Sequence, residues 1–150
     1  MKELKKFNRY VMCFFLGARL AYAESINGSS TINNRDISGS LNIGVWKDAS
    51  VNINGTVNIK QYFSVATCNG QSSTCPTGGL NASANINNSA KVGASVTIVG
   101  DSSKGILDID GGSSLYTQQL WVSGNDNDKT SNFSDDSNGS LKINNGSNVF

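Results

Sequence analysis

The catalytic chemistry open to this chain is limited because its sequence contains no histidine. Histidine triads, imidazole metal sites and histidine acid–base catalysis are therefore excluded. Asp108 and Asp110 flank Ile109 in an alternating polar and apolar run. A glycosidase needs two carboxylates that face each other across a cleft, whereas neighbours on one strand face point the same way. We therefore predict no catalytic residues and interpret this pair as part of a solvated polar face.

Carboxylates also gather between residues 124 and 138, with Asp126, Asp128, Asp135 and Asp136 among asparagines and serines. Such oxygens are calcium ligands in other proteins. The spacing here matches neither an EF-hand loop nor a Gly-Gly-x-Gly-x-Asp repeat. We predict a solvated loop, with no metal site and no cofactor.

The chain has three cysteines, of which Cys13 lies in a predicted targeting segment. Cys68 and Cys75 remain as an even pair, and we predict a disulfide between them in an oxidising compartment. The loop that it closes is short, so its contribution to stability is at most about 2–3 kcal/mol. Without histidine, two cysteines do not complete a usual zinc site.

Three aromatic residues are candidates for binding. Trp46, Tyr116 and Trp121 each stand beside an apolar residue that is expected to point inward, so their own side chains are expected to point outward. Exposed aromatic rings can stack on a sugar or on a partner surface. The alternative is that they shield neighbouring segments, since single exposed apolar residues are ordinary.

The N-terminal segment has the features of a signal peptide over residues 1–23. It begins with a positively charged stretch that contains Lys2, Lys5, Lys6 and Arg9. An apolar run from Val11 to Leu20 and the cleavage motif Ala21-Tyr22-Ala23 follow. The run is shorter than the ~20 apolar residues of a membrane-spanning helix. We therefore expect export to the periplasm, the cell surface or the medium, and no transmembrane segment in the mature chain.

Cleavage at this site changes the charge of the chain. It removes five of the 12 basic residues and one of the 11 acidic residues, so that seven and ten remain and the net charge is −3. Nucleic-acid binding requires a basic surface that neutralises phosphates. The composition therefore argues against a nucleic-acid partner.

Apolar residues recur at every second position, which is typical of strands with one buried face. The alternating sets are Leu41/Ile43/Val45, Val51/Ile53, Val57/Ile59, Val96/Ile98, Leu107/Ile109, Leu120/Val122 and Leu141/Ile143. No sustained helical periodicity is present. Together with the many Asn, Ser and Gly residues, which favour turns, this pattern predicts an all-β chain of short strands.

These strands recur in a longer repeat. The segments Gly39–Ile43, Gly105–Ile109 and Gly139–Ile143 resemble one another, and Asp110–Tyr116 matches Asn144–Phe150 position for position. A further copy places Ala84–Ile86, Val92 and Val96–Ile98 in parallel with Leu107–Ile109, Leu115 and Leu120–Val122. Repeats of this kind predict a solenoid over residues 24–150, in which each turn buries its apolar residues against its neighbours.

An antiparallel β-sandwich is the structural alternative. Five Asn-Gly pairs fit the corners of a solenoid, but they also fit two-residue hairpin turns. Two segments depart from the repeat, about 61–79 and 124–138, and we expect them to be surface loops.

The segments Gly105–Leu115 and Gly139–Val149 follow the form Gly-x-Leu-x-Ile-x-x-Gly-Ser-x-Val. With the signal peptide, they make the chain resemble the N-terminal part of an autotransporter passenger, a protein of type V secretion. That resemblance implies a right-handed parallel β-helix at the outer membrane surface, with sparse, short-range disulfides.

Autotransporters end in an outer-membrane β-barrel, for which 150 residues leave no room. The sequence stops within a repeat copy, so we expect a truncated product or the first piece of a longer protein. Its last turn would expose apolar residues and favour self-association.

The resemblance implies a non-enzymatic structural or adhesion module (an adhesin). Its expected partners are a host or bacterial surface glycan or protein, or another copy of itself. The alternatives are a pilin-like structural subunit and, less favoured, a polysaccharide-acting β-helix enzyme.

Overall fold

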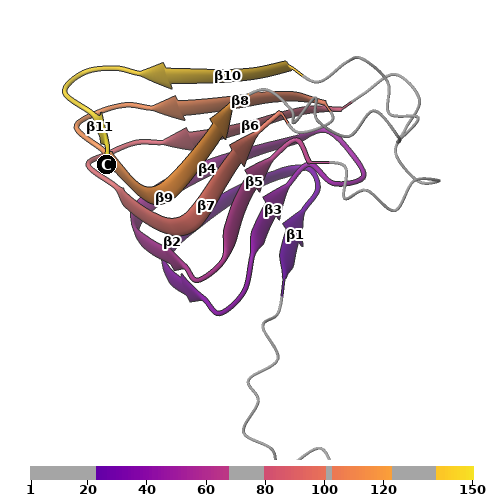
Figure 1. Cartoon of the computed structure of the whole chain (residues 1–150), viewed down its shortest axis with the longest axis horizontal. Coiled ribbons are helices and arrows are strands. Elements are labelled where there is room, and N and C mark those ends of the chain that lie inside the picture. Colours follow the sequence, from indigo (N-terminus) through magenta and orange to yellow (C-terminus); the bar gives the residue numbers. More distant parts are fainter. Residues whose placement is uncertain (1–22, 68–79, 101–102, 123–137) are drawn as a thin grey trace, which may run out of the picture.

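The computed structural model describes residues 23–67, 80–100, 103–122 and 138–150 (Figure 1). These residues form eleven strands in one sheet, and every pairing between them is parallel. The strands are β1 Glu24–Ile26, β2 Ser29–Ile37, β3 Leu41–Ile43, β4 Ala49–Ile59, β5 Tyr62–Val65, β6 Asn81–Ile86, β7 Lys91–Val99, β8 Lys104–Ile109, β9 Ser114–Val122, β10 Asn138–Ile143 and β11 Asn148–Val149. The prediction of an all-β chain is confirmed for this part of the sequence, and the antiparallel sandwich is wrong for it.

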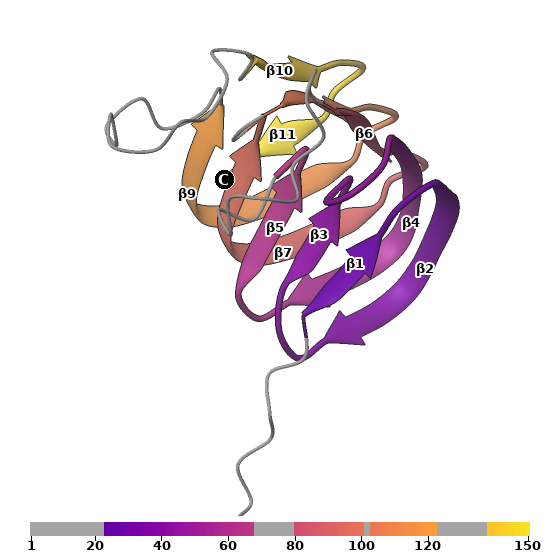
Figure 2. The same cartoon turned by 90° about the vertical axis from the view of Figure 1, so that its right-hand side faces the viewer.

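The strands stack in three columns, which we call faces 1, 2 and 3. Face 1 contains the first halves of β2 and β4, followed by β6, β8 and β10. Face 2 contains the second halves of β2 and β4, the first halves of β7 and β9, and β11. Face 3 contains β1, β3, β5 and the second halves of β7 and β9. Figure 1 shows β6, β8 and β10 one above another, and Figure 2 shows β1, β3, β5 and β7 side by side.

The chain visits the three faces in the same order each time. It passes along face 1, bends into face 2, continues to face 3 and then returns to face 1 beside the strand that it formed there before. We call one such passage a circuit. Neighbouring strands of a face therefore belong to successive circuits, about 4.8 Å apart.

Residues with left-handed backbone mark the corners. Gly55 has φ 74° and lies between the face 1 and face 2 halves of β4, and Asn145 has φ 49° at the equivalent corner between β10 and β11. Glycine and asparagine reach this conformation at the least cost. The pairs Asn54-Gly55 and Asn145-Gly146 therefore form corners between consecutive segments on faces 1 and 2, and they are not hairpin turns.

The core is built from columns of like residues that point inward. On face 1, five isoleucines are in register across the circuits: Ile32, Ile53, Ile86, Ile109 and Ile143. Ile53, Ile86 and Ile109 are fully buried, and Ile143, on the last described strand of the face, is exposed. Complete burial of one such side chain contributes roughly 1.5–3 kcal/mol, so each circuit is stabilised mainly by the circuits on either side.

The register confirms the strongest repeat match and corrects a weaker one. Gly139–Ile143 lies directly on Gly105–Ile109, and Val149 lies on Leu115, as the sequence match predicted. Gly39–Ile43, by contrast, leads into β3 on face 3, so it is not the equivalent of Gly105–Ile109. A five-residue pattern of period two fits every face, and therefore it does not identify the face.

The inward residues of the second half of β7 also differ from the prediction. Thr97 and Val99 are fully buried, whereas Val96 and Ile98 are only partly buried and point to the other side of the strand. Thr97 pairs with Leu120, where the repeat match had placed Val96. Thr97 Oγ1 lies 3.1 Å from Thr117 Oγ1, and this hydrogen bond makes burial of the hydroxyl tolerable. Because the inward Thr97 is polar, the alternation of apolar residues in the sequence selects Val96 and Ile98, which lie one position away from the true inward set.

The loop predicted at 61–79 begins later than expected, because Tyr62–Val65 forms β5. Phe63 and Val65 are fully buried on face 3, and they hold this segment in the sheet. The rest of that loop from residue 68, nearly all of the loop at 124–138, and residues 1–22 of the predicted signal peptide lie outside the described residues.

Candidate binding surface

The two carboxylates considered for catalysis have structural partners. Asp108 accepts a hydrogen bond from Asn144 Nδ2 at 3.2 Å, and Asp110 accepts one from Asn145 Nδ2 at 2.5 Å. Asp110 also accepts the backbone N–H of Gly111 at 2.7 Å. The two asparagine contacts join β8 and its corner to the next circuit, and the Gly111 contact lies within the corner. Both carboxylates thus hold circuits together, in the polar surface that the sequence indicated.

Asparagine side chains make the same kind of link elsewhere on faces 1 and 2. The linked pairs are Asn33 with Asn54, Asn54 with Asn88, Asn52 with Asn85, and Asp36 with Asn58. Sequence reasoning assigned asparagine to corners and missed these ladders. The signal was present, since partners are separated by one repeat. Many polar side chains on the outer surfaces of these two faces are therefore engaged in internal hydrogen bonds, although Ile106, Tyr116 and Phe150 are exposed there.

Serines at corners satisfy buried backbone groups between circuits. Ser113 Oγ accepts the N–H of Ala90 at 3.1 Å, and Ser147 Oγ accepts the N–H of Ser113 at 3.1 Å. Both serines are buried and occupy the same position of the matched copies. Their role was missed as well, although their recurrence in the repeat pointed to it.

The three candidate aromatic residues are exposed but lie in different places. Trp46 is 45% exposed and follows β3 at a corner, where its backbone N–H donates to Asn27 Oδ1 at 2.8 Å. Tyr116 is 44% exposed on face 2 and stacks on Phe150 with ring centroids 5.0 Å apart. Trp121 is 44% exposed on face 3. The structure does not gather them into one site, and a binding role for each stays a prediction.

Face 3 has a different outer surface from the other two faces. One outward column runs from Tyr62 to Val96 and Gln119, and the other runs from Asn42 through Ser64 and Ile98 to Trp121. These columns combine aromatic and aliphatic side chains with Asn42, Ser64 and Gln119, and no ladder of hydrogen-bonded asparagines runs along the described part of this face. Sequence reasoning missed Tyr62 because it assigned this residue to a loop.

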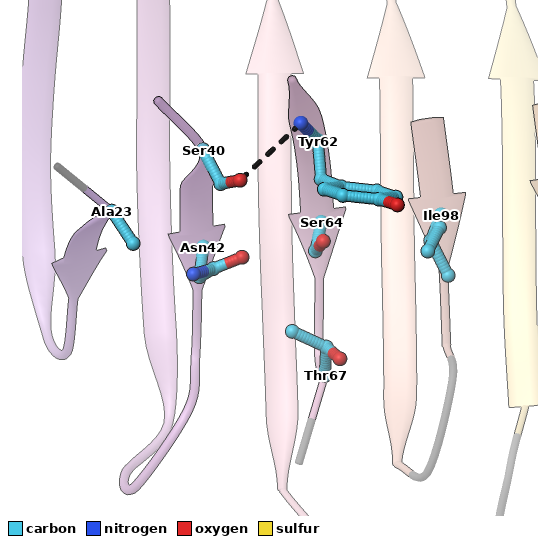
Figure 3. Close-up of a pocket in the computed structure, with 7 residues that line it drawn as sticks. All are labelled: Ala23, Ser40, Asn42, Tyr62, Ser64, Thr67 and Ile98. Carbon is cyan, nitrogen blue, oxygen red and sulfur yellow. Dashed lines mark hydrogen bonds between the residues drawn. The ribbon is translucent and has the colours of Figure 1, made fainter. Parts of the chain in front are cut away.

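A depression of about 290 Å³ lies in this surface (Figure 3). It is lined by Ala23, Ser40, Asn42, Tyr62, Ser64, Thr67 and Ile98. These residues come from several circuits, so the stacking itself creates the depression. The Ser40 hydroxyl donates to Gln61 Oε1 at 3.3 Å and accepts the backbone N–H of Tyr62 at 3.4 Å, which anchors the start of β5.

The remaining candidate features are metal binding, the predicted disulfide and a membrane-spanning helix. Within the described ranges, no cluster of three or more His, Cys, Asp or Glu side chains is arranged to hold a metal ion. The predicted disulfide between Cys68 and Cys75 and the acidic cluster at 124–138 fall outside those ranges. A search of the same ranges found no helix with the length and hydropathy needed to span a membrane.

Comparison with known proteins gives one informative similarity. The chain is 86% identical over 124 residues to YuaO, an uncharacterized protein of Escherichia coli strain K12. The match covers 83% of this chain but 7% of that protein. Neither a protein-family model nor a solved structure matches the chain. The chain is therefore similar to a short part of a much longer bacterial protein.

Proposed function

We propose that residues 24–150 form a right-handed parallel β-helix that serves as a non-enzymatic structural or adhesion module of an exported surface protein, like the N-terminal part of an autotransporter passenger. The observation that carries this proposal is the uninterrupted parallel stacking of successive circuits over three faces. Parallel crossover connections within a sheet are right-handed in about 98% of cases, which favours the right-handed form.

A stack of this kind suits adhesion because it offers long, nearly flat surfaces on a rigid support. Faces 1 and 2 are cross-linked by asparagine and aspartate side chains. Face 3 carries exposed apolar and aromatic side chains, and so does face 2 at Tyr116 and Phe150. These features support a module in which the polar side-chain contacts stiffen the stack and exposed rings make contacts with a partner.

Export is the second part of the proposal and is supported by the signal-peptide features of residues 1–23. The similarity to a small part of a longer protein fits a module within a larger surface protein. A polysaccharide-acting enzyme is less well supported, because Asp108 and Asp110 are occupied by hydrogen bonds to Asn144 and Asn145.

Export is tested by expressing residues 1–150 in a Gram-negative host and measuring the mass of the product by intact-protein mass spectrometry. We expect a mature chain that starts at Glu24 in the periplasmic fraction. A matched control with Ala21→Leu and Ala23→Leu should keep its signal segment. An uncleaved wild-type chain in the cytoplasm would contradict the export proposal.

Adhesion is tested with beads coated with residues 24–150 and incubated with epithelial cells or with bacteria. The proposal predicts greater retention than for albumin-coated beads. Retention equal to albumin on both cell types would contradict an adhesive role for this part of the chain.

A further inference from the structure

We propose that the depression on face 3 binds a small neutral carbohydrate of one or two rings, stacked on Tyr62. This inference deepens the proposed adhesive function and rests on it, because it gives the adhesive surface a ligand class and a location. Three features of the depression support this assignment: the exposure of Tyr62, the unpaired Asn42 amide beside it, and the absence of charged side chains in the lining.

Tyr62 provides the platform. Its side chain is 49% exposed, and Figure 3 shows its ring extending along the outer surface toward Ile98. The start of β5 is fixed from behind by Phe63, which is fully buried, and by the contact of the Tyr62 N–H with Ser40. An aromatic ring held on a rigid strand presents an apolar face and a hydroxyl at its tip. A sugar ring, with its apolar C–H face and hydroxyl rim, has the complementary pattern.

Asn42 provides a polar contact next to that platform, and Ser64, which is only 3% exposed, lines the depression beside it. Their Cα atoms are paired across β3 and β5, and both side chains line the depression. Asparagines 33, 52, 54, 58, 85, 88, 144 and 145 all take part in side-chain hydrogen bonds. The Asn42 amide and the Ser64 hydroxyl, in contrast, form no side-chain hydrogen bond to any residue that the structure describes. An amide offers both donors and an acceptor, which suits adjacent sugar hydroxyls.

The lining selects against charged ligands and against large ones. None of the seven lining side chains carries a charge, so no side chain in the lining neutralises a phosphate, sulfate or carboxylate. Cleavage after Ala23 leaves the other six residues in the mature chain, with the α-amino group of Glu24 next to them. Its volume of about 290 Å³ is at the lower limit of ligand pockets, which typically measure roughly 300–1,000 Å³. A monosaccharide or disaccharide unit matches both the size and the neutral polarity.

The test is an NMR titration of ¹⁵N-labelled residues 24–150 with methyl glycosides of glucose, galactose, mannose and N-acetylglucosamine, and with lactose and maltose. Concentrations extend to roughly 50 mM, because a shallow site for one ring is expected to have millimolar affinity. We expect at least one sugar to shift the amide signals of Asn42, Tyr62 and Ser64 in a saturable way.

Four variants test whether the sugar binds in the depression. Tyr62→Ala should weaken binding at least about 10-fold, and Asn42→Ala about 3- to 10-fold, the loss expected for one or two hydrogen bonds. The matched controls are Phe150→Ala, an exposed ring on face 2, and Asn81→Ala on face 1, and both should bind as wild type. Because the Asn42 side chain makes no hydrogen bond to a described residue, its variant is expected to keep the fold, which circular dichroism checks.

Two results would overturn the inference. One is the absence of saturable shifts at Asn42, Tyr62 and Ser64 with every sugar. The other is an equal loss of affinity in the control variants. If the coated beads still adhere to cells while no sugar binds, the glycan site is rejected, a protein partner is favoured, and the adhesive function stands.

Discussion

Gly105 allows the closest test of how the circuits pack. It lies in β8 on face 1 and is buried. A Cβ added there would lie 2.5 Å from the backbone nitrogen of Gly100 and 2.7 Å from the carbonyl oxygen of Val65. Those two atoms are the donor and the acceptor of a 2.8 Å hydrogen bond between successive circuits. Gly105→Ala therefore places a methyl group against a backbone contact that has no flexible side chain to move.

The cost can be estimated from these contacts. Overpacking that forces the backbone to shift costs typically about 1–3 kcal/mol, and weakening a buried hydrogen bond costs about 1 kcal/mol. Replacing glycine by alanine gains about 0.4–1 kcal/mol by restricting the unfolded chain. The net expectation is a loss of about 2 kcal/mol in the free energy of unfolding.

Gly93→Ala is the matched control, since Gly93 also lies within a strand and the nearest atom to its added Cβ is Asn58 Oδ1 at 3.7 Å. That variant should equal wild type or gain up to about 1 kcal/mol. Urea and thermal unfolding measure both, and a loss of 2 kcal/mol corresponds to a fall in Tm of roughly 4–8 °C. Equal stability of Gly105→Ala and Gly93→Ala would refute the proposed packing of β8 against the preceding circuits.

Three further predictions concern the core and the corners, and urea unfolding measures each of them. Leu107→Ala should lose about 2–5 kcal/mol because its side chain is fully buried, and a loss under 1 kcal/mol would contradict its place in the core. Val99→Ser should lose about 2–4 kcal/mol, whereas Ile98→Ser should change stability by less than about 1 kcal/mol. A larger loss for Ile98→Ser than for Val99→Ser would instead favour the register predicted from the sequence, in which Val96 and Ile98 point inward. Ser113→Ala should lose about 1–2 kcal/mol because it removes an acceptor of the Ala90 N–H, and an unchanged stability would show that the hydroxyl is dispensable.

Much of the fold is predictable from the sequence because strand alternation and stacking both repeat. Residues such as Leu107, Ile109, Leu141 and Ile143 recur with the same spacing, and the structure places them in register. Stacked circuits require like residues at like positions, so the repeat in the sequence is a direct consequence of the packing.

The register of face 3 was not predictable in the same way. Thr97 is buried through a hydrogen bond to Thr117, a partner that only the three-dimensional arrangement supplies. Similarly, Phe63-Ser64-Val65 alternates over only three residues, which is too short a pattern to distinguish from a loop.

The candidate binding surface is likewise only partly predictable from the sequence. The outward direction of Trp46, Tyr116 and Trp121 follows from their apolar neighbours in the sequence. The depression does not, because Ser40, Tyr62 and Ile98 come together only when β3, β5 and β7 stack. Residues separated by one circuit form this surface, so its shape depends on the register.

The parallel stacking of circuits is tested most directly by NMR with ¹³C-labelled isoleucine methyl groups. The account predicts strong methyl–methyl contacts between Ile53 and Ile86 and between Ile86 and Ile109, which are neighbours in one column. It predicts much weaker contact between Ile53 and Ile109, which lie two strand spacings apart, about 10 Å. Absence of the two neighbour contacts, or a contact between Ile53 and Ile109 as strong as either, would contradict the stacked circuits.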